Sequence, residues 1–250
     1  MKRVIKYLVK VFYIKEIYFE SLKTIRKVIE YNEWLHSMLS KIVFDLSNAF
    51  NWKLTRIPYF LARQIRNTDI VIDCGANVGK IVKPLLHFKP TIYCFEPNPV
   101  AFQQLQENLG NSENIHFIEK AVGVENRTAR LFKHISSIDS EEKELIHSVS
   151  ASLLSNKPNV DKENYYEINI IDLVEFIRSI NKEILFVKID IEGAEVELVN
   201  ALLDHEIHNK IKYIFVETHE HTIPDLFNST IALKNRVKRL NINNIYFNWT

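Results

Sequence analysis

Apolar positions along the chain follow two different spacings, one before residue 50 and one after residue 68. Up to residue 48 the apolar residues recur every three or four positions, as they do on one face of an α-helix. No Gly or Pro interrupts this region before Pro58. The pattern therefore predicts an N-terminal helical extension, to which we assign residues 1–68.

From residue 69 onwards, short apolar runs alternate with helical patterns. Strands are predicted at residues 69–73, 91–95, 115–118, 130–132, 166–171, 185–189, 213–216 and 245–247. Helices are predicted at residues 80–88, 99–109, 172–180, 194–203 and 231–240. This alternation predicts an α/β fold for residues 69–250, with a Rossmann-like, mostly parallel sheet and helices on both of its faces. Right-handed crossovers then bring the carboxyl ends of the strands to one edge, where ligands bind.

Charge is distributed unevenly along the chain. The whole chain has a formal net charge of only +1, so we expect no nucleic-acid partner. Residues 1–30 nevertheless hold eight basic and three acidic residues, an excess of five positive charges. Two interpretations of this segment stay open. It could be a helical cap on the main domain, or a basic amphipathic surface that contacts an anionic membrane or another partner.

The first apolar region is broken by charges at Lys6, Lys10 and Lys15. A membrane span needs about 20 mostly apolar residues, and a signal peptide needs an uninterrupted apolar core. We therefore expect a cytoplasmic protein, with peripheral membrane contact through residues 1–30 under the second interpretation. The two cysteines, Cys74 and Cys94, are expected to be free thiols packed as small apolar groups.

A glycine turn follows the strand predicted at residues 69–73. Asp73 ends that strand, and Gly75 and Gly79 come next. Glycines permit a sharp turn and a close approach of the backbone to a ligand, and a helix N-terminus attracts anions. Many nucleotide-binding folds have such a turn, but a nicotinamide enzyme would be expected to show G-x-G-x-x-G, whose second glycine is missing here.

Two carboxylates sharpen this interpretation. Asp73 is placed to receive the ammonium of an amino-acid ligand. Glu96, 23 residues later at the end of the next strand, is placed to bind both hydroxyls of a ribose. A ligand that contains both groups is S-adenosylmethionine, which we predict as the cofactor.

Charged residues directly follow the strand predicted at 185–189. Lys188 and Asp190 point the same way if both continue that strand. If they are buried together, their pKa values are expected to be perturbed, which is a mark of functional sites. Glu192 and Glu195 follow, and for these the alternative is structural, because acidic residues favour a helix N-terminus.

A third group follows the strand predicted at 213–216 and contains Glu217, His219 and His221. His219 is a candidate general base, because the ordinary pKa of histidine lies near neutral pH. A structural role for this histidine stays open as the alternative. His221 lies further from the strand and is the weaker candidate.

Together these motifs resemble the FkbM family of methyltransferases. The resemblance extends from about residue 69 to residue 221, with a weaker tail to 250, and its most specific part is Lys-Ile-Asp-Ile-Glu-Gly-Ala-Glu at residues 188–195. It implies S-adenosylmethionine as the methyl donor, O-methylation, and acceptors such as sugar hydroxyls of surface glycans, glycolipids or natural products. The family core does not explain the N-terminal helices. One final strand is predicted where this class usually has a hairpin.

The resemblance also implies a role for each site residue. The methionine part of the donor would be held by Asp73, Gly75, Asn77 and Gly79, the ribose by Glu96, and the adenine would lie near Ala121 and Val122. The acceptor would face Asp190, Glu192, Glu217 and His219.

The expected reaction is transfer of a methyl group to an acceptor hydroxyl, with His219 or Asp190 as general base. We predict no metal ligands, although Asp190, Glu192 and Glu217 could together hold a divalent ion. The alternatives are a non-catalytic module that binds S-adenosylmethionine, a nicotinamide-dependent oxidoreductase and a nucleic-acid methyltransferase. An Asn-Pro-Pro-Tyr-like tetrapeptide would favour the last of these, but residues 190–193 are Asp-Ile-Glu-Gly.

Overall fold

The computed structural model describes residues 64–137, 145, 153 and 160–247. The predicted N-terminal extension lies almost wholly outside these residues, so its helices and both interpretations of its basic segment stay predictions. Among the described residues, no helix is both long enough and apolar enough to cross a membrane.

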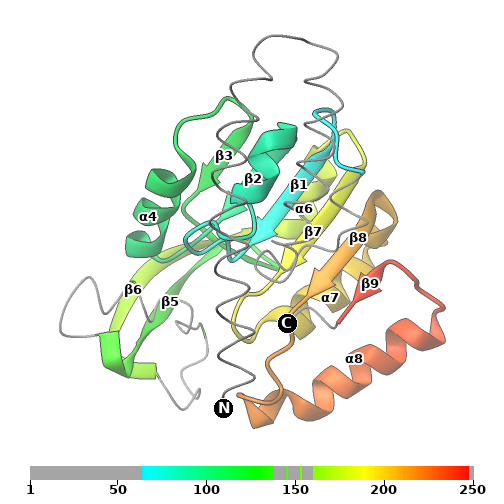
Figure 1. The fold of residues 1–250 in the computed structure, drawn as a ribbon. Helices are drawn as coiled ribbons and strands as arrows, with labels where there is room; N and C mark the ends of the chain where they lie inside the picture. The colour runs from blue at the N-terminus through cyan, green and yellow to red at the C-terminus, as the bar shows by residue number, and fades with distance from the viewer. Residues whose placement is uncertain (1–63, 138–144, 146–152, 154–159, 248–250) are drawn as a thin grey trace, which may run out of the picture. The chain divides into compact units, whose positions relative to one another are not determined.

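The main sheet has six strands in the order β3-β2-β1-β7-β8-β9, and every neighbouring pair is parallel (Figure 1). The strands are β1 (Ile70–Cys74), β2 (Thr91–Phe95), β3 (Ile115–Ile118), β7 (Ile184–Ile189), β8 (Ile211–Val216) and β9 (Ile245–Tyr246). This confirms the predicted parallel sheet. Short apolar runs form its central strands because both faces of those strands are buried.

Helices cover both faces of the sheet, as predicted. In β1, Ile70 and Ile72 pack into one core and Val71 into the other, as the two-residue period of a strand requires. The first core includes residues of the helices α6 (Leu173–Ser179), α7 (Glu195–Asp204) and α8 (Phe227–Arg239). The second core includes residues of the 3₁₀ helix η1 (Lys83–Phe88) and of α4 (Pro99–Leu109).

Two helices differ from their predicted limits by more than one residue at an end. Residues 80–88 were expected to form one helix, but the structure has turns followed by the six-residue η1. Pro84 lacks a backbone N–H, and Lys89 adopts a left-handed conformation that ends the element. Because these residues form turns and a 3₁₀ helix, the glycine turn is not followed directly by an α-helix. The other difference is α8, which begins at Phe227, four residues before the predicted start.

A second, three-stranded sheet has the order β4-β6-β5. It contains β4 (Ala121–Gly123), β5 (Arg127–His134) and β6 (Val160–Asp172). The strands predicted at 130–132 and 166–171 are parts of β5 and β6, which pair antiparallel with a register shift between Phe132 and Lys133. Figure 1 shows this pair running away from the main sheet, below α4. The sequence did not predict this second sheet.

The last described strand, β9, has only two residues and pairs parallel with β8. Within the part of the chain that the structure describes, no hairpin follows it. Since all six strands of the main sheet run the same way, their carboxyl ends meet at one edge.

Candidate active site

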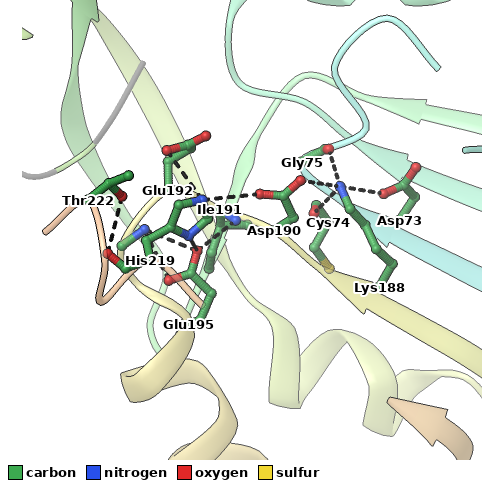
Figure 2. A network of polar contacts seen from close by, with 11 residues as sticks. Asp73, Cys74, Gly75, Lys188, Asp190, Ile191, Glu192, Glu195, His219 and Thr222 are labelled. Carbon is green, nitrogen blue, oxygen red and sulfur yellow. Dashed lines mark hydrogen bonds and ion pairs between the residues drawn. The ribbon is translucent and has the colours of Figure 1, made fainter. Parts of the chain in front are cut away.

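The carboxyl edge of the main sheet brings together three of the predicted motifs. Asp73 is in register with Lys188, and Ile189 is in register with Val216, so the segments that follow β1, β7 and β8 are neighbours. Figure 2 shows a continuous network of polar contacts that extends from Asp73 through Lys188 and Asp190 to His219.

The glycine turn after β1 contains three residues with positive φ, which are Gly75, Asn77 and Gly79. A Cβ atom on Gly75 would lie 1.9 Å from the backbone oxygen of Asp190, and one on Gly79 would lie 2.8 Å from a methyl carbon of Leu105. Close packing therefore requires glycine at position 75, whereas at position 79 the φ of +81° is what favours glycine. This adds to the sequence interpretation, which assigned the glycines to contact with a ligand.

Glu96 connects the glycine turn to the start of α4. Its Oε2 accepts a hydrogen bond from the backbone N–H of Asn77 at 2.8 Å, and its Oε1 accepts one from Asn98 at 2.9 Å. Burial raises the pKa of Glu96 to about 7, although these hydrogen bonds and the Lys188 charge oppose the rise. Binding of a ribose by this carboxylate stays a prediction.

Lys188 and Asp190 lie side by side in the structure, as the sequence predicted. The Lys188 Nζ lies 3.2 Å from Oδ2 of Asp190, 3.2 Å from Oδ1 of Asp73, and donates to the carbonyl oxygen of Gly75 at 2.6 Å. Burial lowers the pKa of Lys188, but the two aspartates outweigh burial and hold this pKa above its usual value, so the amine stays charged. Burial raises the pKa of Asp73, and Lys188 opposes that rise.

His219 lies among acidic side chains (Figure 2). Its Nδ1 is 3.0 Å from Oε1 of Glu195, and its Nε2 is 3.5 Å from Oε2 of Glu192 and 3.7 Å from Oδ1 of Asp190. Burial opposes protonation, but hydrogen bonds and charges of Glu192 and Glu195 outweigh it and raise the pKa of His219 to about 10. The imidazole is therefore protonated at neutral pH in this arrangement.

For Glu195 the sequence left a structural role at the helix start open as the alternative, and the structure shows that its carboxylate also contacts the candidate base. Its carboxylate is almost wholly buried and accepts hydrogen bonds from the backbone N–H groups of Ile191 and Gly193, which lie just before α7. The same carboxylate holds Nδ1 of His219. A sequence signal existed: Glu195 lies on the apolar stripe of its helix, with Leu198, Val199 and Leu202, where burial is expected.

Asp190, Glu217 and His219 form a group that could hold a metal ion, because one ligand atom from each lies within 4.8 Å of the others. The sequence had suggested Glu192 in place of His219. The backbone of Glu217 is held by its N–H, which donates to the carbonyl oxygen of Ile189. His221 is exposed.

Ala121 and Val122 lie in β4, close to the end of β3 in the sequence, and their side chains are buried. Ala121 packs in the core of the second sheet and Val122 in the first core of the main sheet. That these two residues lie near an adenine stays a prediction. The free thiols of Cys74 and Cys94 are buried, as expected.

Replacement of Glu195 by Gln is expected to lower the pKa of His219 from about 10 toward its ordinary value of 6.5, because one of the carboxylates that favour the imidazolium loses its charge. NMR titration of the imidazole C–H protons measures this pKa. The exposed Glu197, in the first turn of the same helix, provides the control Glu197→Gln. An unchanged pKa in Glu195→Gln would show that Glu195 does not act on His219.

The same variant tests a linked change in stability. The pKa of His219 in the folded protein lies above its ordinary value of 6.5, so the protonated imidazole stabilises the fold fully below pH 6.5. This contribution is lost as the pH rises from 6.5 to about 10. We expect the free energy of unfolding to fall less over this range in Glu195→Gln than in the wild type, as measured by urea unfolding.

Comparison with known proteins gives a family match over the segment that contains these residues. The family model described as the methyltransferase FkbM domain matches residues 73–240, more than half of the chain. The chain is also 25% identical over 157 residues to a protein named 2-O-methyltransferase NoeI from Sinorhizobium fredii (strain NBRC 101917 / NGR234). That match covers 59% of this chain and 62% of the relative, so the chain spans less than two thirds of the relative's length.

The search of solved structures finds no match. The assignment therefore rests on the family match, which begins at Asp73 and extends through the glycine turn, Lys188, Asp190 and His219 into α8. The predicted resemblance is confirmed, and the chain belongs to the FkbM methyltransferase domain family.

Proposed function

We propose that this protein is an S-adenosylmethionine-dependent O-methyltransferase that acts on a sugar hydroxyl. The observation that carries the proposal is the position of His219. Glu195 holds Nδ1 of its imidazole, Nε2 faces Asp190, and Asp190 is joined through Lys188 to the glycine turn. The candidate general base, His219, thus lies close to the glycine turn, to which we assign the methyl donor.

The residues at this edge suit a cationic donor that carries an amino-acid group. Oδ2 of Asp73 is buried and accepts no hydrogen bond from any described residue, so an ammonium group there would supply the missing partner. Asp190 and Glu192 are partly exposed, with 25% and 22% of their side-chain surface accessible, and they give the edge a negative charge. When bound, S-adenosylmethionine supplies an electrophilic methyl group on a sulfonium.

We assign the residues that would hold this cofactor as the family resemblance implied. The methionine part is assigned to Asp73, Gly75, Asn77 and Gly79, the ribose to Glu96, and the adenine to the vicinity of Ala121 and Val122. The backbone around Asn77 is preorganised for this role, because Glu96 fixes its N–H and Lys188 fixes the carbonyl of Gly75.

His219 is our candidate for removing the proton from the acceptor hydroxyl, and its Nε2 is the atom that would accept that proton. It must first lose the proton that it holds at neutral pH. A cationic ligand bound beside the surrounding carboxylates would lower the pKa of His219 and so favour that loss. Glu195 then keeps Nδ1 protonated and Nε2 turned toward the acceptor. Asp190 is the alternative base in the same place.

A sugar acceptor is supported by the polar, acidic side of the site. Carboxylates such as Asp190, Glu192 and Glu217 accept hydrogen bonds from hydroxyl groups. The relative from Sinorhizobium fredii is named as a 2-O-methyltransferase. We therefore propose a hydroxyl of a glycan, a glycolipid or a related natural product as the methyl acceptor.

Two assays test this function. Calorimetry with S-adenosylmethionine and, separately, with NAD is expected to show binding of the first ligand only. A labelled methyl group is then expected to be transferred to members of a panel of oligosaccharides, and the corresponding 2-deoxy sugars serve as controls. A parallel assay with EDTA tests whether transfer needs a divalent metal ion. Binding without transfer to any acceptor would contradict the enzymatic part of the proposal, and failure to bind S-adenosylmethionine would contradict all of it.

A further inference from the structure

Lys188 lies where the donor turn meets the acceptor residues. It belongs to β7, is in register with Asp73 of β1, and only 3% of its surface is exposed. Its Nζ lies within 3.4 Å of four oxygen atoms, which belong to Asp73, Cys74, Gly75 and Asp190. Two of these oxygens are backbone carbonyls at the start of the glycine turn, so the ammonium binds directly to that turn (Figure 2).

Asp190 connects this ammonium to the candidate base. Its Oδ2 lies 3.2 Å from Nζ of Lys188, and its Oδ1 lies 3.7 Å from Nε2 of His219. The two carboxylate oxygens thus face in different directions, one toward each cation. The contact with Lys188 restricts rotation of the Asp190 side chain, and so keeps the other carboxylate oxygen facing the histidine.

The backbones of the two segments are also in contact. The N–H of Asp190 donates to the carbonyl oxygen of Cys74 at 3.2 Å, and the backbone oxygen of Asp190 fills the space beside Gly75. A movement of the glycine turn would therefore displace Asp190 as well. The side chain of Lys188 also joins the two segments, because its Nζ contacts the carbonyl oxygen of Gly75 and the carboxylate of Asp190.

A buried ion pair adds little net stability, because desolvation of the two charges offsets their attraction. What the four contacts of Lys188 do provide is a fixed geometry across two strands. We propose that Lys188 is a positioning residue for methyl transfer, which holds the glycine turn and the Asp190 carboxylate at a fixed distance from each other. This inference rests on the proposed function, because the distance matters only if a donor binds on one side and an acceptor on the other.

The test compares two variants that differ only at Lys188. The single substitution Lys188→Met would leave buried carboxylates unpaired and could fail to fold. Asp73→Asn and the double variant Asp73→Asn/Lys188→Met are therefore compared, because the double variant removes the buried ion pair of Lys188 with Asp73 as a unit. At saturating S-adenosylmethionine, we expect the double variant to have a kcat about 100-fold below that of Asp73→Asn, since a displacement of about 1 Å can cost that much. Lys212→Met, at an exposed lysine of β8, is the control substitution.

A second measurement needs no cofactor or acceptor. Hydrogen exchange at the N–H groups of Gly75 and Asp190, which bond to Phe95 and Cys74, reports opening of the two segments. We expect both to exchange at least about tenfold faster in the double variant than in Asp73→Asn, with no change in α8. Equal kcat values in the two variants would overturn the proposal. If the wild type methylates no acceptor, the proposed function fails, and unchanged exchange rates would then overturn the role of Lys188 separately.

Discussion

Replacement of His219 by Ala is expected to reduce turnover about 100- to 10,000-fold, which is the usual contribution of a general base. The affinity for S-adenosylmethionine should change little, because the imidazole contacts Glu195, Glu192 and Asp190, which are not among the residues assigned to the cofactor. Initial rates at saturating donor and acceptor measure the first quantity, and calorimetry measures the second.

The control for this substitution is His221→Ala, because His221 lies two residues further along the same loop and is exposed. It should retain turnover within a factor of about two, as expected for an exposed residue outside the site. If His219→Ala keeps full turnover, His219 is not the base and Asp190 takes its place as the candidate. If affinity for the donor falls together with turnover, His219 acts in binding.

The main sheet could be predicted because its central strands are short apolar runs that follow each other with helices between them. The second sheet could not. Most positions of β5 and β6 are exposed or half-buried, and residues 135–159 separate the two strands. Their pairing also contains a register shift after Phe132, which the spacing of apolar residues does not show. Local patterns predict elements more readily than they predict which distant elements pair.

Part of the candidate site could likewise be predicted from the sequence, and part could not. Asp73, Lys188 and Asp190 could be placed at one edge because each lies at or just after the end of a parallel strand. The pairing of Asp73 with Lys188 depends on β1 lying beside β7, and those strands are far apart in the sequence. The contact of Glu195 with His219 depends on the turn before α7, where Glu192 and Gly193 both adopt positive φ. A non-glycine residue with positive φ is uncommon, so this turn could not be expected from residue types alone.

The turn after β1 should be the least tolerant part of the site. Replacement of Gly75 by Ala is expected to lower the free energy of unfolding by about 2–6 kcal/mol, from two sources. The φ of +77° costs a non-glycine residue about 1–3 kcal/mol, and relief of a 1.9 Å contact with the Asp190 oxygen adds about 1–3 kcal/mol of overpacking. Because that contact joins the donor turn to Asp190, binding of S-adenosylmethionine should be lost as well.

A substitution at Gly110 separates the cost of the positive φ from the cost of overpacking. It also has a positive φ, +66°, but a Cβ atom there would meet no atom within 4 Å. Gly110→Ala should therefore cost only the backbone strain of about 1–3 kcal/mol and leave donor binding intact. Urea unfolding and calorimetry on both variants give the comparison. Equal losses of stability, or retained binding in Gly75→Ala, would mean that the segment after β7 moves aside easily, and that the contact between Gly75 and Asp190 does not fix the spacing of the two halves of the site.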